Sequence, residues 1–236
     1  ATQSRLHRIL ATNAEGSSEW TANAAPNYAT FTVTDASWHP MMEHPDQLIL
    51  YIGDGNLLAQ VNAGTFTANA LDIKSPLRIK SLGRIGTDIL LGTYVNDNIT
   101  KTNLLRWNGW SVSFTTADEI DEVGINAFLP GDNVVFVQAG KAGNIYIYDG
   151  YKLNLWKKIP GVYSPTKYGE VYPNAVGNLE GQILFGFSNG TGNPADQGVY
   201  RLGRYSADYK YVMDMPYPIS QRSSGELVTT SVEIGS

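Results

Sequence analysis

The sequence predicts an all-β fold, a β-propeller of four-stranded antiparallel blades, from three observations. A polar residue, an apolar run and a Gly or Asn turn follow one another in four copies, at 56–62, 103–109, 144–150 and 197–203. Successive copies start about 40 to 55 residues apart, and a strand-rich repeat of about 40–50 residues is typical of propeller blades. The chain has 24 Gly, 14 Tyr, 7 Phe and 5 Trp, which suits short strands joined by tight turns. No segment shows the sustained 3.6-residue period of an amphipathic helix.

Each copy is predicted to be the third strand of a blade, and a recognisable second strand precedes it. The second strands are short, nearly continuous apolar runs opened by a polar residue, at 47–53, 88–94, 133–137 and 182–187. Such runs fit strands buried on both faces, here between neighbouring blades. The segment Gly53-Asp54-Gly55-Asn56 has the composition of a tight hairpin, and 139–143 that of a slightly longer one.

The first and fourth strands complete each blade. We expect the fourth strands at 65–68, 111–115, 153–157 and 209–213. The first strands, which face the central channel in a propeller, have a weaker pattern. They are predicted at 79–82, 124–128 and 174–179.

These strands predict a single domain over 1–236. Each of its two ends holds only part of a blade, so the pairing of these ends decides how the propeller closes. Its blades lie near 31–72, 78–116, 124–158 and 174–214, with partial blades at 1–30 and 226–236. One arrangement is a ring of about five blades in which the C-terminal strand pairs with the N-terminal ones. The other is an excised part of a larger propeller. The second is favoured, because native closures usually complete a four-stranded blade.

Composition excludes several classes of function. The formal net charge is −5, which argues against duplex nucleic acid and against an anionic membrane surface as partners. No stretch approaches the ~18 consecutive apolar residues of a membrane-spanning helix. Cys is absent, so disulfides, thiolate nucleophiles and Cys-ligated zinc are excluded. The spacing in His39-Pro40-Met41-Met42-Glu43-His44 does not fit a zinc motif, and we expect neither a metal nor a cofactor.

Three tyrosines in one connection, 160–173, are the candidate binding residues: Tyr163, Tyr168 and Tyr172. Three prolines restrict the backbone of this connection. Tyrosine offers a large contact area and a hydroxyl group at low entropic cost, as interfaces and sugar sites require. The competing interpretation is that these rings only cover the edge of a blade.

Two other loops and one acidic run are weaker candidates. The loop 188–197 is long, small and polar, and Asn96-Asp97-Asn98 could offer oxygen ligands, although not at the alternate positions of a calcium loop. The run Asp118-Glu119-Ile120-Asp121-Glu122 precedes a predicted inner strand, where a pair of carboxylates would suit glycosidic chemistry. We expect it instead to be a solvated loop, as charge clusters usually are. No catalytic residue is assigned.

Part of the chain resembles a known group of proteins. The stretch 48–56, continued through 65–72, is similar to blade sequences in propeller-containing virion proteins, tail- or capsid-associated, of tailed bacteriophages. The resemblance covers about three blades, from Gln47 to Met213, and rests on turns and strand patterns only. The resemblance therefore implies a propeller fold and a place in a virion, and it assigns no catalytic residue. The Trp-Asp pairs of WD repeats and the Asp-box pattern of sialidases are missing.

The expected function is a non-enzymatic structural or interaction module, used for assembly docking or host attachment in a virion or outside the cell. Its partners would be other protein subunits of a large assembly, or a surface glycan. One alternative is a carbohydrate-active enzyme of the glycoside hydrolase kind, which needs acids from at least two blades at one channel mouth. Another is a lectin-like propeller, which needs an aromatic residue repeated at equivalent loop positions. Trp107 and Tyr148 are equivalent, but Val61 and Leu202 break the series, so these rings are interpreted as packing between blades.

Overall fold

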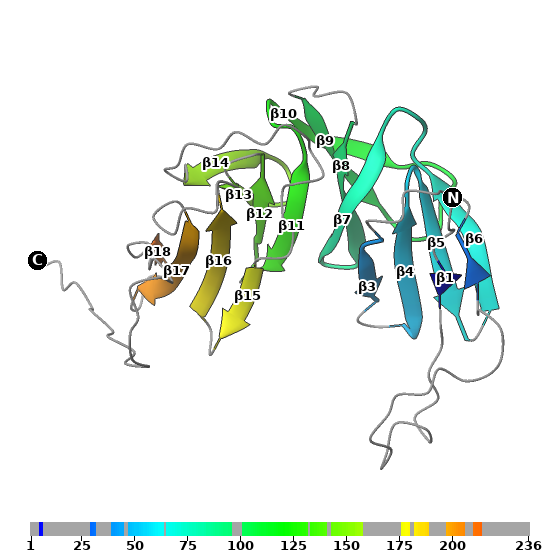
Figure 1. Ribbon diagram of the computed structural model, residues 1–236, viewed down its shortest axis with the longest axis horizontal. Helices are drawn as coiled ribbons and strands as arrows, with labels where there is room; N and C mark the ends of the chain where they lie inside the picture. The colour runs from blue at the N-terminus through cyan, green and yellow to red at the C-terminus, as the bar shows by residue number, and fades with distance from the viewer. Residues whose placement is uncertain are drawn as a thin grey trace, which may run out of the picture.

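The protein is built of β-strands, and the part of the chain that the structure describes contains no helix. The structure is a computed structural model, and it describes residues 5–6, 29–31, 39–44, 47–63, 65–95, 101–131, 133–140, 143–157, 176–179, 182–188, 197–205 and 210–213. Most of its strands form four sheets of four strands each (Figure 1). No helix among these residues is long and apolar enough to cross a membrane.

Every four-stranded sheet is an antiparallel meander in which strands adjacent in sequence are paired. The first sheet contains β3 (Met41–Glu43), β4 (Ile49–Asp54), β5 (Leu57–Asn62) and β6 (Thr65–Asp72). The second contains β7 (Arg78–Ile85), β8 (Asp88–Tyr94), β9 (Thr102–Trp107) and β10 (Thr115–Ile120). The third contains β11 (Ile125–Pro130), β12 (Val135–Ala139), β13 (Asn144–Tyr148) and β14 (Leu153–Lys157). The fourth contains β15 (Val176–Leu179), β16 (Gln182–Ser188), β17 (Gln197–Tyr205) and β18 (Lys210–Met213).

The all-β, four-stranded antiparallel organisation predicted from the sequence is thus confirmed. The predicted hairpin at 53–56 is also confirmed, because Asp54 pairs with Leu57 across a two-residue turn whose first residue, Gly55, has a φ of 65°. A positive φ at that position is readily adopted only by glycine. Gly86, with a φ of 56°, has the same role between Ile85 and Asp88 in the second sheet.

One strand lies elsewhere than predicted. The fourth strand of the second sheet was expected at 111–115, but β10 runs from Thr115 to Ile120, past the expected end of that blade at 116. The residues before it close the turn: the indole Nε1 of Trp107 donates to the carbonyl of Ser111 at 2.7 Å, and Val112 is 97% exposed. Consequently three of the five residues of the acidic run, which was expected to be a solvated loop, lie in a strand that pairs with β9.

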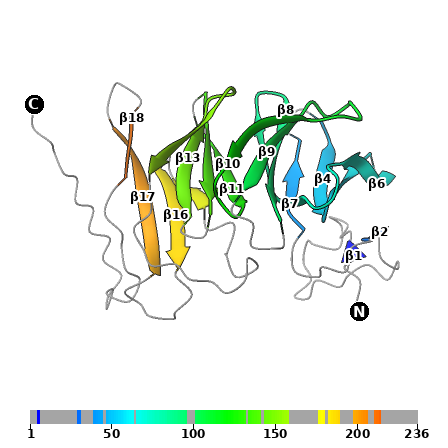
Figure 2. The same ribbon diagram turned by 90° about the horizontal axis from the view of Figure 1, so that it is seen from above.

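The four sheets follow one another along the chain and contact each other through their first strands. β3 lies against β7, β7 against β11, and β11 against β15. In Figures 1 and 2 the first and fourth sheets stand at opposite ends of this array. Among the described residues, no strand of the first sheet pairs with a strand of the fourth. A separate small sheet pairs β1 (Arg5–Leu6) with β2 (Ala29–Thr30), within the predicted partial blade 1–30.

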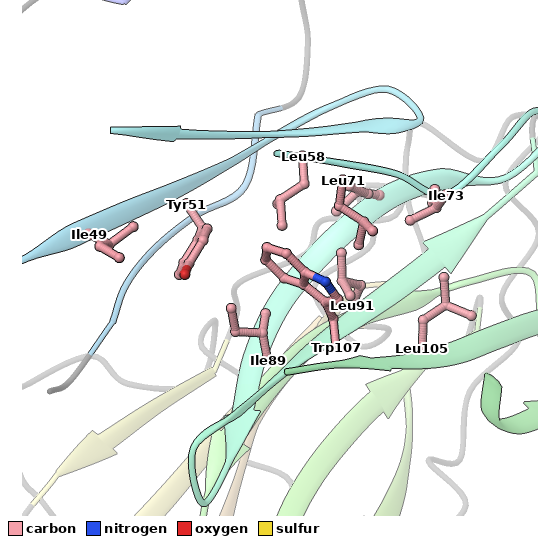
Figure 3. Packing of buried hydrophobic residues seen from close by; sticks show 10 residues of the cluster. Ile49, Tyr51, Leu58, Leu71, Ile73, Ile89, Leu91, Leu105 and Trp107 are labelled. Atoms are coloured by element: carbon pink, nitrogen blue, oxygen red, sulfur yellow. The ribbon is translucent and has the colours of Figure 1, made fainter. Parts of the chain in front are cut away.

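Apolar side chains fill the spaces between sheets. Between the first and second sheets, Tyr51 of β4 and Trp107 of β9 meet edge to face at 5.8 Å, surrounded by branched aliphatic residues (Figure 3). A second cluster joins the second and third sheets, and includes Leu90, Ile125 and Tyr148. The second strands β4, β8 and β12 are buried on both faces almost throughout, as predicted. This burial explains why their sequences do not alternate.

Candidate functional site

One edge of the array collects the turns that join first to second and third to fourth strands. Strand direction alternates in an antiparallel meander, so both kinds of turn lie at the same edge of each sheet. We call this edge the turn face. In the second and third sheets it comprises four turns, at 86–87, 108–114, 131–134 and 149–152.

The turn face is hollowed between the second and third sheets by a cleft of about 810 Å³. Ligand sites commonly have volumes of about 300–1,000 Å³. Its lining comes from β7 and β9 on one side, and from the β11–β12 and β13–β14 turns on the other. The charged, amide and aromatic side chains among the lining residues are Arg84, Arg106, Asn133, Asp149 and Tyr151.

Arg106 is held in place at the side of this cleft. Its Nε donates to Asp88 Oδ2 at 2.5 Å, and its Nη1 donates to the main-chain carbonyl of Gly150 at 3.2 Å. The hydroxyl of Tyr148 donates to the same carbonyl at 3.0 Å. The hydrogen bond to Asp88 is the main cause that raises the pKa of the Arg106 guanidinium. This arginine thus has a fixed orientation and bridges two sheets.

Arg84 differs from Arg106 in being exposed. It lies near the end of β7, beside the turn at Gly86. Within the described part of the chain, no carboxylate lies within ion-pair distance of its guanidinium. Its side chain lines the cleft, where its N–H donors can serve a ligand.

The two third-to-fourth turns of this face have the same construction. Asn108 Oδ1 accepts from the backbone N–H groups of Trp110 and Ser111, at 3.0 and 2.9 Å. Asp149 Oδ1 accepts from those of Tyr151 and Lys152, both at 2.9 Å. The backbone hydrogen bond from Lys152 is the main cause that lowers the pKa of Asp149.

Each of these turns carries glycine at its second position and an aromatic residue at its third. Gly109 and Gly150 have φ values of 84° and 98°, which other residues rarely adopt. Trp110 and Tyr151 follow them, and these rings are 73% and 90% exposed. The sequence analysis missed this pair, although an Asx-Gly-aromatic triplet at 108–110 and again at 149–151 was its visible signal.

The aromatic residues singled out in the sequence fall into two groups: two are buried, and three lie outside the described residues. Trp107 and Tyr148 are buried, which confirms their interpretation as packing between sheets. The predicted binding residues Tyr163, Tyr168 and Tyr172 lie outside the described residues, as do the interior of the loop 188–197 and the segment Asn96-Asp97-Asn98. Those predictions therefore stay predictions.

The acidic run is engaged in contacts within the fold. Asp118 Oδ2 accepts from the backbone N–H of Leu153 at 2.7 Å, and Glu119 pairs with Lys101 at 2.7 Å. Asp121 lies 4.0 Å from the same lysine, and Glu122 Oε1 accepts from the amide of Asn144 at 2.8 Å and from the hydroxyl of Tyr146 at 3.0 Å.

The histidine-containing segment is also part of the fold. His39 Nδ1 lies 2.9 Å from the carbonyl oxygen of Gly53, and the ring stacks on Phe31 at a centroid distance of 4.4 Å. Over the described ranges, no three His, Asp or Glu side chains come together as metal ligands would.

Comparison with known proteins gives distant structural similarities only. No protein-family model and no curated protein matches the chain. The computationally designed Ika8 protein is similar in structure, with a TM-score of 0.40 and 14% identity over 69% of this chain. An alpha-L-arabinofuranosidase from Clostridium thermocellum has a TM-score of 0.43 and 13% identity over 77% of this chain. The chain spans 44% of the first of these proteins and 73% of the second, and at these scores neither similarity assigns a function to it.

Proposed function

We propose that this chain belongs to a β-propeller that acts as a non-enzymatic interaction module, and that its turn face contacts the partner. One observation carries the proposal: two turns that begin with the same Asx-Gly-aromatic order and the same Asx hydrogen bonds present Trp110 and Tyr151 to solvent at the same edge of neighbouring sheets. An aromatic ring exposed on a rigid turn loses little conformational entropy on binding. Such rings are the usual anchors of protein–protein and protein–glycan contacts.

The propeller assignment is supported by the way the sheets contact one another. Their first strands adjoin in sequence order, as the inner strands of blades do around a channel. Apolar clusters fill the spaces between the sheets on both sides of the second sheet. We keep both closures in the proposal, a ring of about five blades and a part of a larger propeller.

The proposed setting is a virion or a similar large extracellular assembly, in which the module docks subunits or attaches to a host. This setting rests on the resemblance of 48–56 and 65–72 to blades of bacteriophage virion proteins. The physical argument is compatible with it, since a stiff array of sheets offers loops and turns as a broad docking surface.

The first test is the size of the native species that carries the chain, measured by sedimentation velocity on material from its source. The chain is expected in a particle far larger than its own 25.8 kDa. Recovery of the chain only as a free monomer would overturn the assembly part of the proposal.

The second test concerns the turn face itself. Purified chain is added back to particles depleted of it, and rebinding is compared for wild type and for the double variant Trp110→Ala/Tyr151→Ala. We expect at least a tenfold loss of rebinding for the double variant, because exposed aromatic anchors dominate such contacts. Leu155→Ala is the control, since this residue is also apolar and exposed but lies on β14 rather than in a turn. Equal rebinding of all three proteins would exclude the turn face as the contact.

A further inference from the structure

We infer that the cleft between the second and third sheets is a binding site for a saccharide that carries a carboxylate group. The inference rests on the proposed function, because it names the ligand class for the same turn face. It is argued from the side chains that line the cleft, from which of them form ion pairs or hydrogen bonds, and from the turns that make up one of its walls.

The carboxylate is assigned to Arg84. This guanidinium is exposed in the cleft, and no described carboxylate pairs with it. Arg106, the other cation of the lining, is already bound to Asp88 and to the carbonyl of Gly150. Arginine binds a carboxylate through two parallel N–H···O bonds, and these charge-assisted bonds are about twice as strong as neutral ones.

The rest of the lining suits the hydroxyl groups and the apolar face of a sugar. Asn133 offers an exposed amide that both donates and accepts, and Asp149 offers a carboxylate that accepts from hydroxyl groups. Tyr151 offers an aromatic ring that is 90% exposed. The face of such a ring is negative, and it attracts the polarised C–H groups on one side of a sugar.

An acidic peptide or a polyanion fits this cleft less well. A peptide that binds by adding a strand needs a free sheet edge, and the third-sheet wall of the cleft is made chiefly of the turns at 130–135 and 149–151. The carboxylate of Asp149 in the same lining repels a ligand that carries many negative charges. The lining therefore suits a ligand that carries one anionic group and many hydroxyl groups.

The test uses the full chain and, as the probe, a tetramer of three xylose units and one glucuronic acid, which carries a single carboxylate, with isothermal titration calorimetry as the measurement. The matched neutral probe is the same tetramer with its one carboxyl group methyl-esterified. We expect binding of the acid, and binding at least about tenfold weaker for the ester, because each lost charge-assisted hydrogen bond is worth about a factor of ten or more. A peptide of six glutamates is the third probe.

Substitutions locate the binding. Arg84→Gln is expected to weaken the acidic tetramer about tenfold and to leave the ester unchanged, whereas Tyr151→Ala weakens both, by about threefold to tenfold. Lys152→Gln is the charge-matched control: this lysine is exposed next to the cleft but does not line it, and its loss is expected to have little effect. Equal losses of affinity in Arg84→Gln and Lys152→Gln would show that the tetramer is bound by nonspecific charge attraction, and would overturn the inference.

The remaining outcomes separate the inference from the proposed function. Binding of the glutamate peptide as tight as that of the tetramer would overturn the saccharide assignment, and so would equal affinity for acid and ester. If the tetramer does not bind but particle rebinding still depends on Trp110 and Tyr151, the inference falls and the proposed function stands. If the tetramer binds through Arg84 while the native chain is a free monomer, the assembly proposal falls and the saccharide site stands.

Discussion

The guanidinium of Arg106, on the third strand of the second sheet, donates a 3.2 Å hydrogen bond to the main-chain carbonyl of Gly150 in the third sheet. Asp88, on the neighbouring strand β8, holds the same guanidinium through its Nε atom. A charged side chain thus joins the two sheets at the turn face, above the apolar cluster that joins them below. Arg106 and Gly150 both line the cleft, so this joint forms part of its wall.

The ion pair between Arg106 and Asp88 is expected to contribute modestly to stability. The side chains are 40% and 22% exposed, and solvent weakens the attraction between partly exposed charges. A double-mutant cycle of Arg106→Ala and Asp88→Ala, measured by urea unfolding, should give a coupling free energy of about 0.5–1 kcal/mol. The control cycle uses Lys101 and Glu119, which are more exposed, and should give a smaller value. A larger coupling in the control pair would contradict this account.

Gly83 of β7 packs directly against the side chain of Phe128 on β11, and we predict that Gly83→Ala destabilises the fold. A Cβ atom at this position of β7 would lie 2.5 Å from Cγ of Phe128 on β11, which is closer than atoms can pack. Overpacking of this kind costs about 1–3 kcal/mol of unfolding free energy. Urea unfolding measures this cost, and the cost should be smaller in a Phe128→Ala background, where Cγ and the ring are absent. An unchanged cost in that background would show that Phe128 is not the obstacle.

The sequence predicted the strands that burial makes distinctive. Continuous apolar runs identified β4, β8 and β12, and the glycine of the 53–56 segment identified its hairpin. The position of β10 was predicted wrongly because Ser111-Val112-Ser113-Phe114 alternates between polar and apolar residues, as a strand does. In the structure this segment belongs to a turn that begins with Asn108 and Gly109. Local alternation cannot reveal that the preceding Asx residue has already reversed the chain.

The candidate cleft was not predictable from the sequence for a different reason. Arg84 and Tyr151 are far apart in the chain and share a lining only because β7 and β11 adjoin. Which arginine is paired also depends on strand register: Leu90 lies opposite Arg106 in the β8–β9 pair, which places Asp88 diagonally across from Arg106, within hydrogen-bond distance. Arg84 lies opposite Ile89, and no described carboxylate forms an ion pair with it.

Asp72 is predicted to make stability depend on pH in the acid range. Its carboxylate accepts from the side chain and the backbone N–H of Lys74, at 2.7 and 2.8 Å, and from Asn56 at 2.8 Å. The hydrogen bond from the Lys74 side chain is the largest of the causes that lower the pKa of Asp72 from 3.8 to about 2. A depressed pKa in the folded state favours folding at pH values above 3.8, and this contribution is lost as the pH falls through the interval down to about 2.

Thermal unfolding followed by circular dichroism between about pH 6 and about pH 2.5 measures this loss. The melting temperature of the wild type should fall more steeply over the interval than that of Asp72→Asn, which has no proton to bind there. Asp121→Asn is the control, because its carboxylate lies 4.0 Å from the nearest cation and is strongly exposed. Parallel curves for wild type and Asp72→Asn would contradict the prediction.

Glu122 is predicted to stabilise the third sheet rather than to serve as a catalytic acid. Its Oε1 receives the amide of Asn144 and the hydroxyl of Tyr146, and its carboxyl group packs where a side chain at Gly140 would otherwise stand. Burial, with Glu122 as the next cause, raises the pKa of Tyr146, so this hydroxyl stays protonated and keeps donating over the ordinary pH range. Removing the acceptor leaves two partly buried donors unpaired, which costs about 1–3 kcal/mol.

Urea unfolding of Glu122→Ala should therefore show a loss of about 1–3 kcal/mol, and Glu122→Gln, which keeps one acceptor oxygen, a smaller loss. Glu119→Ala is the matched control in the same acidic run, because its side chain pairs with the exposed Lys101 and its removal should cost little. The same variants test the alternative: release of sugar from a uronate oligomer by the wild type, abolished in Glu122→Gln without loss of stability, would assign this carboxyl group to catalysis. The two hydrogen bonds that Glu122 accepts through Oε1, both from residues of β13 in the same sheet, argue for the structural outcome.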